Sequence, residues 1–296
     1  MKKYNYTAFL LILLLALSCK SKQQTAAPVY QIGIGGSIIG YQEQPLIDSI
    51  LQTALDYEAL YTLLDDIKPM SSVKLYRFPL ANPDSARQTS ANIVDREKHG
   101  RHLDRLYAVQ QAVNRIDFPD LKFVLVPYKS AQDSFRIVQL SVVRISSLDS
   151  LLQAKEAFFG QFGLVPGADP ATVVSTIENA GRYERNRGYG YLFGYPDYAV
   201  DFFIEAAVES AKAKKILPRK FFQIPVYARE AGSFTYAYPE DHTPTAAIDS
   251  TIYYRSGKVL EKYKNIRNNY LNADSTVRAY QLLQDMYKQS PSIIDK

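Results

Sequence analysis

The chain has 296 residues, with one cysteine, no tryptophan and 23 tyrosines. Its 35 basic and 30 acidic side chains give a formal net charge of +5, an excess too small and too dispersed to indicate a nucleic-acid partner. A single cysteine excludes a disulfide within the chain, and the length is sufficient for one large domain or two small ones.

The first eighteen residues predict a secretory signal peptide. Lys2 and Lys3 form a basic start, and residues 8–17 are an apolar run of ten residues, too short for a membrane-spanning helix, which needs ~20. This end of the chain resembles the lipobox of bacterial lipoprotein precursors, with small residues before Cys19 but Ala16 where leucine is usual. The resemblance implies that Cys19 is lipidated and becomes the mature N-terminus. The alternative is an ordinary cleaved signal peptide with an incidental cysteine.

The domain organisation follows from this N-terminal end. We expect residues 1–18 to be the signal peptide, 19–28 a small, polar, lipidated tether and 29–296 one globular body, with a sub-boundary near Pro119 as an alternative. The expected location is the bacterial cell envelope, with the membrane unresolved. The expected partners are the lipid bilayer, through the acyl chains, and an envelope protein or small-molecule ligand, without a cofactor.

The first half of the mature chain predicts helices followed by a hairpin. Residues 29–40 indicate a short strand or an irregular entry, and leucines at helical spacing predict a helix over 45–67, stopped by Pro69. A long helix is expected from residue 84 or 85 to 115, exposed or frayed in its front half. Two β-branched runs, 121–128 and 135–145, predict a hairpin.

The second half continues in the same manner. Helices are predicted over 146–162 and 170–179, the second capped by Asp169 and begun by Pro170. A second hairpin is expected over 221–227 and 233–238 around a turn at 230–232, followed by helices over 244–270 and 276–288. The order predicts an α+β fold that is predominantly helical with two β-hairpins.

The densest local signal is the stretch 187–203. Gly188, Gly190 and Gly194 predict a glycine-loosened turn, because glycine permits backbone angles and close approaches that a Cβ would block. The turn runs into a helix that begins at Pro196, with the Asp197 carboxylate at the positive end of the helix dipole.

A basic and aromatic cluster immediately before this helix is the candidate ligand-binding site. Arginine binds carboxylates and phosphates in bidentate fashion, and a first helical turn favours anions, so an acidic small molecule, a sugar or a peptide terminus would fit. The alternative is a structural elbow whose arginines face solvent and whose tyrosines fill the edge of the core. The cluster comprises Arg182, Arg185, Arg187, Tyr189, Tyr191 and Tyr195.

The sequence gives weaker signals for catalytic and metal sites. His99 and His102 are three residues apart with His242 as a distant third ligand, but basic residues surround the pair, so no metal site is predicted. No complete catalytic motif is present, and no catalytic residue is assigned. One alternative is an envelope hydrolase acting on sugar or peptide, with Asp197 or Asp201 paired with Glu178 or Glu184 in one cleft. Another is a structural or assembly lipoprotein.

Overall fold

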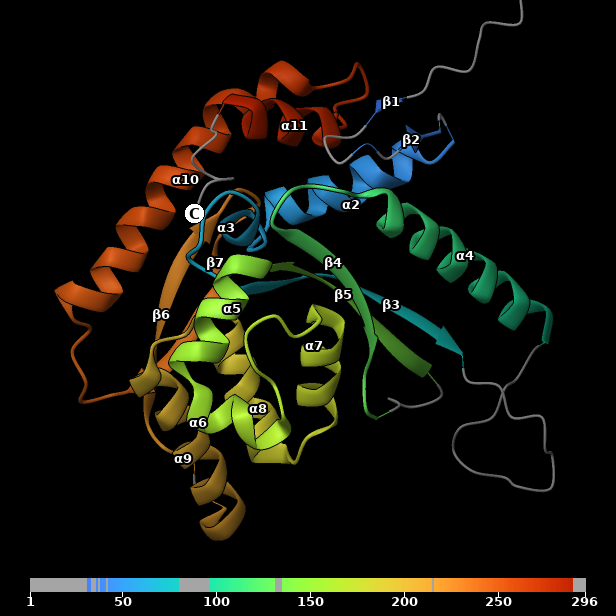
Figure 1. Ribbon diagram of the computed structural model, residues 1–296. Helices are drawn as coiled ribbons and strands as arrows, with labels where there is room; N and C mark the ends of the chain where they lie inside the picture. Colours follow the sequence, from blue (N-terminus) through green and yellow to red (C-terminus); the bar gives the residue numbers. More distant parts are fainter. Residues whose placement is uncertain are drawn as a thin grey trace, which may run out of the picture.

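The computed structural model describes residues 31–32, 36, 38–40, 42–79, 96–130, 135–214 and 216–289. The predicted signal peptide, Cys19, the tether and the front of the helix predicted from residue 84 lie outside the described residues. The described part is α+β and predominantly helical, with both predicted hairpins present in one globular body, so the predicted fold class is confirmed (Figure 1).

The chain enters the fold through a small hairpin of β1 (Gln31–Ile32) and β2 (Ile38–Ile39). The predicted helix over 45–67 is divided into α2 (Gln44–Asp56) and α3 (Leu60–Leu63). The division lies at Tyr57, whose extended backbone (φ −120°, ψ −162°) ends α2. This break at Tyr57 turns α3 and the residues that follow α3 towards the first sheet.

The first sheet has three antiparallel strands in the order β3-β5-β4. The predicted hairpin is confirmed as β4 (Leu121–Pro127) and β5 (Phe135–Arg144), and β3 (Met70–Pro79) pairs with the free edge of β5. Because β5 is central and covered on both faces, its residues from Ile137 to Arg144 are all buried.

Helices cover both faces of this sheet. Leu140 and Val142 of β5 belong to a core shared with α2, α3 and α4 (Arg96–Arg115). Val143, together with Val124 and Val126 of β4, packs on the opposite face. That second core is shared with α5 (Ile145–Ala154), α6 (Glu156–Phe159), the 3₁₀ turn Gly160–Phe162, α7 (Pro170–Asn179) and α8 (Arg182–Leu192). The helix predicted over 146–162 is therefore three shorter pieces, whereas α7 begins as predicted, with Asp169 accepting a hydrogen bond from the Thr172 amide at 2.9 Å.

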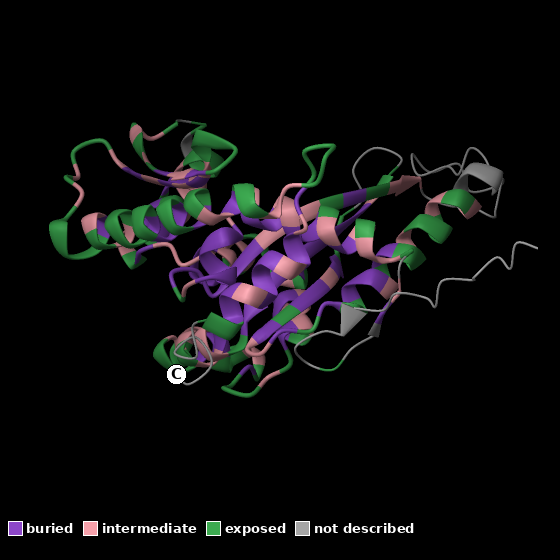
Figure 2. Ribbon diagram, turned by 90° about the horizontal axis from the view of Figure 1, so that it is seen from above, coloured by how far each residue is buried: buried purple, intermediate pink, exposed green. Residues whose placement is uncertain are grey.

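The C-terminal part returns to the first core. After α9 (Asp197–Ala213), β6 (Arg219–Val226) and β7 (Arg229–Pro239) form the second predicted hairpin, but its turn lies at residues 227–228 instead of 230–232. A π-helical turn (Ala246–Ser250) leads into α10 (Thr251–Arg267), a 3₁₀ turn (Asn268–Tyr270) and α11 (Ala279–Gln289). The Tyr280 amide of α11 donates to Asp48 of α2 at 2.8 Å, which joins the two ends of the described chain. Buried residues gather in the middle of the molecule, between helices with exposed outer faces (Figure 2).

The predicted glycine-loosened turn over 187–195 is wrong for most of its length, because residues 182–192 form α8. Gly188 and Gly190 serve close helix packing. A Cβ at Gly188 would lie 2.7 Å from Ile177 Cγ2 of α7, and one at Gly190 would lie 2.8 Å from Val200 Cγ2 of α9. Tertiary packing of the two neighbouring helices outweighs the cost of about 1 kcal/mol for each glycine in a helix.

The actual turn is confined to residues 193–196. Gly194 has φ +72°, and a Cβ there would lie 2.6 Å from the Ile67 carbonyl oxygen, so both the backbone angle and the close approach require glycine. Pro196 occupies the N-cap and α9 begins at Asp197, one residue after the predicted start. The turn places α9 against α8 and carries Tyr195 between them and the second hairpin.

Candidate ligand-binding pocket

The helical conformation of α8 divides the predicted cluster between two faces. Arg185 and Tyr189 are four residues apart and both contact Glu178 of α7, whereas Arg187 and Tyr191 form a second pair on another face. Arg187 donates to the Tyr191 hydroxyl at 3.1 Å and pairs with Asp201 of α9 at 2.5 Å. Arg182 is exposed in the first turn of α8. The six residues therefore do not form one site.

Three members of the cluster, Arg185, Tyr189 and Tyr195, line a cavity of about 560 Å³ that we call the aromatic pocket. The residues that line the pocket come from α8 and α9 on one side and from strands of the two larger sheets on the other. Its volume falls in the range typical of small-molecule sites, about 300–1,000 Å³. The remaining polar and charged residues of its wall are Glu58, Ser72, Gln139, Glu178, Asn186 and Thr235, and the remaining aromatic ones are Tyr128, Phe193, Phe203, Phe221 and Tyr236.

Glu178 is the fixed carboxylate of this pocket. It is 2% exposed, and one of its oxygens accepts hydrogen bonds from the Lys129 amide at 2.9 Å and from Arg185 Nη1 at 3.1 Å. The other oxygen accepts from the Tyr189 hydroxyl at 2.8 Å. Burial, and the Glu178 charge after it, raise the pKa of Tyr189, so this hydroxyl remains a donor at neutral pH. Glu178 is therefore fully engaged, whereas Arg185 uses Nη1 for this contact and its side chain remains 37% exposed.

Glu58 lines the same pocket and pairs with a fully buried lysine. Lys68 Nζ lies 2.5 Å from Glu58 Oε2, and the Lys68 side chain is 0% exposed. The ammonium lies 4.3 Å from the ring centroid of Phe234 and 5.3 Å from that of Phe193, so aromatic faces provide further stabilisation. Burial lowers the pKa of Lys68, and the Glu58 charge opposes that shift.

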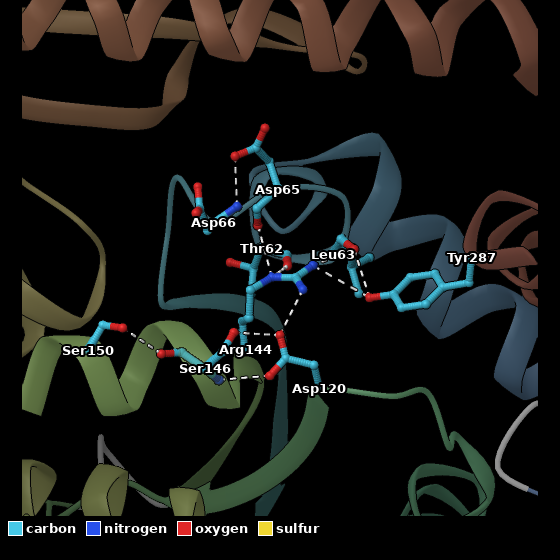
Figure 3. A network of polar contacts seen from close by, with 9 residues as sticks. All are labelled: Thr62, Leu63, Asp65, Asp66, Asp120, Arg144, Ser146, Ser150 and Tyr287. Carbon is cyan, nitrogen blue, oxygen red and sulfur yellow. Dashed lines mark hydrogen bonds and ion pairs between the residues drawn. The ribbon is translucent and has the colours of Figure 1, made fainter. Parts of the chain in front are cut away.

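A second cavity, of about 610 Å³, lies on the other side of Tyr195 and also includes Tyr191 in its wall. Its charged side chains all have partners: Arg144 pairs with Asp120 at 3.0 Å, Lys155 with Asp197 at 2.5 Å, and Arg255 with both Asp65 and Asp66. Asp120 has φ +63° and also accepts from the Ser146 amide and hydroxyl, at 2.7 and 2.6 Å (Figure 3). The charged side chains of this second pocket are consequently engaged with one another.

Other sequence-predicted candidates are not brought together. Glu178 lines the aromatic pocket, Asp197 lines the second pocket and Asp201 pairs with Arg187, so these carboxylates do not share either cavity. Glu184 lies in the exposed first turn of α8. The imidazole of His242 stacks on Tyr198 with ring centroids 4.2 Å apart, while His102 lies on α4. His99 also lies on α4, but its side chain is outside the described residues. Among the described residues, no group of three or more metal-ligating side chains is found.

The sequence does not mark Glu58 and Thr235, which line the pocket, or Lys68, which pairs with Glu58. Lys68 is in a polar-looking stretch after two aspartates, and no local pattern marks it as buried. Thr235 lies in a predicted strand, and the alternation of side chains along the hairpin places it on the same face as Phe221. Only the packing of β7 against α9 brings Thr235 to the pocket.

No protein-family model, no curated protein and no solved structure shows significant similarity to this chain. No helix in the described part of the chain combines the length and apolar character needed to cross a membrane. The pocket geometry is therefore the basis for the functional argument.

Proposed function

We propose that this protein is a bacterial envelope lipoprotein, anchored through acyl chains on Cys19, whose globular body binds a small ligand in the aromatic pocket. The observation that carries the binding role is the cavity of about 560 Å³ with aromatic walls and a few polar groups. Apolar walls supply affinity and a small number of placed polar groups supply orientation, which is the usual composition of a ligand site.

Binding is favoured over hydrolysis because of how the pocket's carboxylates are engaged. A glycosidase needs one carboxylic acid and one carboxylate in contrasting environments, facing the scissile bond. Here Glu178 accepts three hydrogen bonds and Glu58 is paired with Lys68 at 2.5 Å. Both carboxylates thus have the same kind of surroundings, each beside a cationic side chain, instead of the contrasting ones that the reaction needs, so the pocket is better suited to hold a ligand than to cleave one.

The anchor is tested by metabolic labelling. Cells that express the full chain should incorporate an alkyne palmitate analogue into the protein, and Cys19→Ala should abolish that label because it removes the chain's single thiol. Ser18→Ala, which keeps a small residue at the cleavage position, should retain the label. An unlabelled wild type, or a label that survives Cys19→Ala, contradicts lipidation at this position.

The pocket is tested with a neutral fluorescent probe, N-phenyl-1-naphthylamine. The wild type should bind the dye, and Ala237→Phe should weaken binding at least about tenfold, because Ala237 lines the cavity and a phenyl group would fill it. Ala231→Phe, at an exposed position of the same strand, is the matched control and should bind as the wild type does. Equal dye binding by wild type and a folded Ala237→Phe variant would locate the dye elsewhere and contradict the proposed site.

A further inference from the structure

We infer that the ligand of the aromatic pocket is a neutral, polyhydroxylated ring, a carbohydrate of one or two sugar units; this rests on the proposed binding function. Three features of the pocket support this ligand: its charge balance, the unused bonding capacity of polar side chains in its wall, and the aromatic surfaces at its mouth.

The charges around the pocket cancel in pairs. Glu178 is matched by Arg185 at 3.1 Å, and Glu58 is matched by Lys68 at 2.5 Å. An anionic ligand would meet an arginine whose charge Glu178 already offsets, and a cationic ligand would have to compete with Lys68 for Glu58. Because each ion pair is already formed and one partner of each, Glu178 or Lys68, is buried, a charged ligand would gain little and would carry its own desolvation cost into the site.

Two polar side chains that line the pocket nevertheless have bonding capacity that nothing in the described part of the chain uses. Glu58 uses one carboxylate oxygen for Lys68, and no bond to its other oxygen is found among the described residues. The Asn186 side chain makes no hydrogen bond with the residues that the structure describes. A ligand that covers these groups removes them from water, so it is expected to supply both donors and acceptors.

The rest of the wall requires an apolar surface on the same ligand. Phe203 of α9 and Phe221 of β6 are 45% and 55% exposed although both line the cavity, which places bare rings where a ligand enters. Farther along, the rings of Tyr189 and Phe193 stack with centroids 5.5 Å apart. Aromatic faces carry partial negative charge and attract the weakly positive C–H groups of a saturated ring.

A sugar ring has both properties. Its axial C–H groups form an apolar face for the phenylalanines, and its hydroxyls both donate and accept hydrogen bonds, so Glu58 can accept while Asn186 does either. A wholly apolar ligand of the same size would leave Asn186 and Glu58 unsatisfied in a drier pocket. A carbohydrate therefore matches the wall better than an anion, a cation or a hydrocarbon.

The experiment measures binding of neutral sugars to the full-length protein by calorimetry and by displacement of N-phenyl-1-naphthylamine. Glucose, N-acetylglucosamine and cellobiose are the neutral probes, and glucosamine and glucose 6-phosphate are the charged counterparts of glucose. At least one neutral sugar should bind and displace the dye, and neither charged counterpart should bind more tightly than glucose. Tighter binding of a charged counterpart overturns the inference.

The decisive variant is Asn186→Leu, which keeps a side chain of similar size and removes the amide. It should weaken binding of the neutral sugar about tenfold, the effect of one lost hydrogen bond, while dye binding stays within about twofold. Its melting temperature should be unchanged or higher, because the amide makes no hydrogen bond with the residues that the structure describes. Asn114→Leu, at an exposed position of α4, should leave sugar binding unchanged.

The outcomes separate the two proposals. Dye binding that Ala237→Phe abolishes, without displacement by any neutral sugar, would keep the ligand-binding function and overturn the carbohydrate assignment. Absence of both dye and sugar binding would overturn both. Sugar binding that Asn186→Leu leaves intact would place the sugar outside this pocket and also overturn the assignment.

Discussion

Replacing Arg144 with methionine is expected to lower the free energy of unfolding by about 3–5 kcal/mol, the range for removal of one partner from a buried ion pair. Arg144 is 3% exposed at the end of β5. Its Nη1 donates to Asp120 at 3.0 Å, so the substitution leaves that carboxylate without its counterion. The guanidinium also donates to the carbonyl oxygens of Thr62 and Leu63, at 3.1 and 3.0 Å (Figure 3).

These carbonyl acceptors explain why the effect should extend beyond one ion pair. Thr62 and Leu63 are the last residues of α3, and the final carbonyl groups of a helix have no partner within it. Arg144 also donates to the Asp65 carbonyl at 3.0 Å and approaches the Tyr287 hydroxyl at 3.5 Å. Burial, opposed by Arg144, raises the pKa of Tyr287 to about 12, so this hydroxyl stays protonated at neutral pH. One side chain thus joins α3, the three-stranded sheet and α11.

Urea denaturation followed by circular dichroism measures the effect. Arg144→Lys should recover only part of the lost stability, because an ammonium has three donors on a flexible stem and cannot reproduce the planar fork. Arg255→Gln is the matched control: this arginine pairs with Asp65 and Asp66 but is 46% exposed, so its removal should cost at most about 1 kcal/mol. Full recovery by lysine, or an equal loss in the control, would contradict the role assigned to the buried network.

Local chemistry explains which elements could be predicted. Both larger hairpins follow from β-branched and aromatic runs, and Asp169 and Pro170 mark the start of α7 because a cap and a preset φ act within one turn. The same holds at Pro196 and Asp197, where the sequence predicts the helix start to within one residue. These signals depend on neighbours in the sequence.

The errors arose where distant packing decides the local structure. Gly188 and Gly190 indicate a loop in isolation, but in the fold they admit Ile177 and Val200, from the helices on either side of α8. The division of the cluster has the same cause, since a helix separates Arg187 from Arg185 although they are two residues apart. Thr235 reaches the pocket wall only through the placement of the second hairpin against α9, for which the sequence has no short-range signal.

Glu58→Gln should have the second large effect, lowering the free energy of unfolding by about 3–5 kcal/mol near neutral pH. The reason is an asymmetry in burial: Lys68 is 0% exposed, whereas the Glu58 side chain is 19% exposed and lines the pocket. Removing the carboxylate leaves an ammonium with no counterion in a fully buried position. Lys68→Met is the matched variant and should cost less, because Glu58 can then be solvated from the pocket. An equal or larger loss in Lys68→Met would contradict this account.

The pH dependence gives an independent check. Burial already lowers the pKa of Lys68, and in Glu58→Gln the opposing charge is gone, so the pKa should fall further. Between that lowered pKa and the ordinary lysine value of about 10.4, the unfolded chain binds more protons than the folded one, and stability rises with pH. The variant enters this window at a lower pH than the wild type. The loss in free energy of unfolding caused by Glu58→Gln, measured by denaturation, should therefore be smaller at about pH 9 than at about pH 6. The smaller loss caused by Lys68→Met should show no such decrease, because that variant has no lysine at this position to deprotonate.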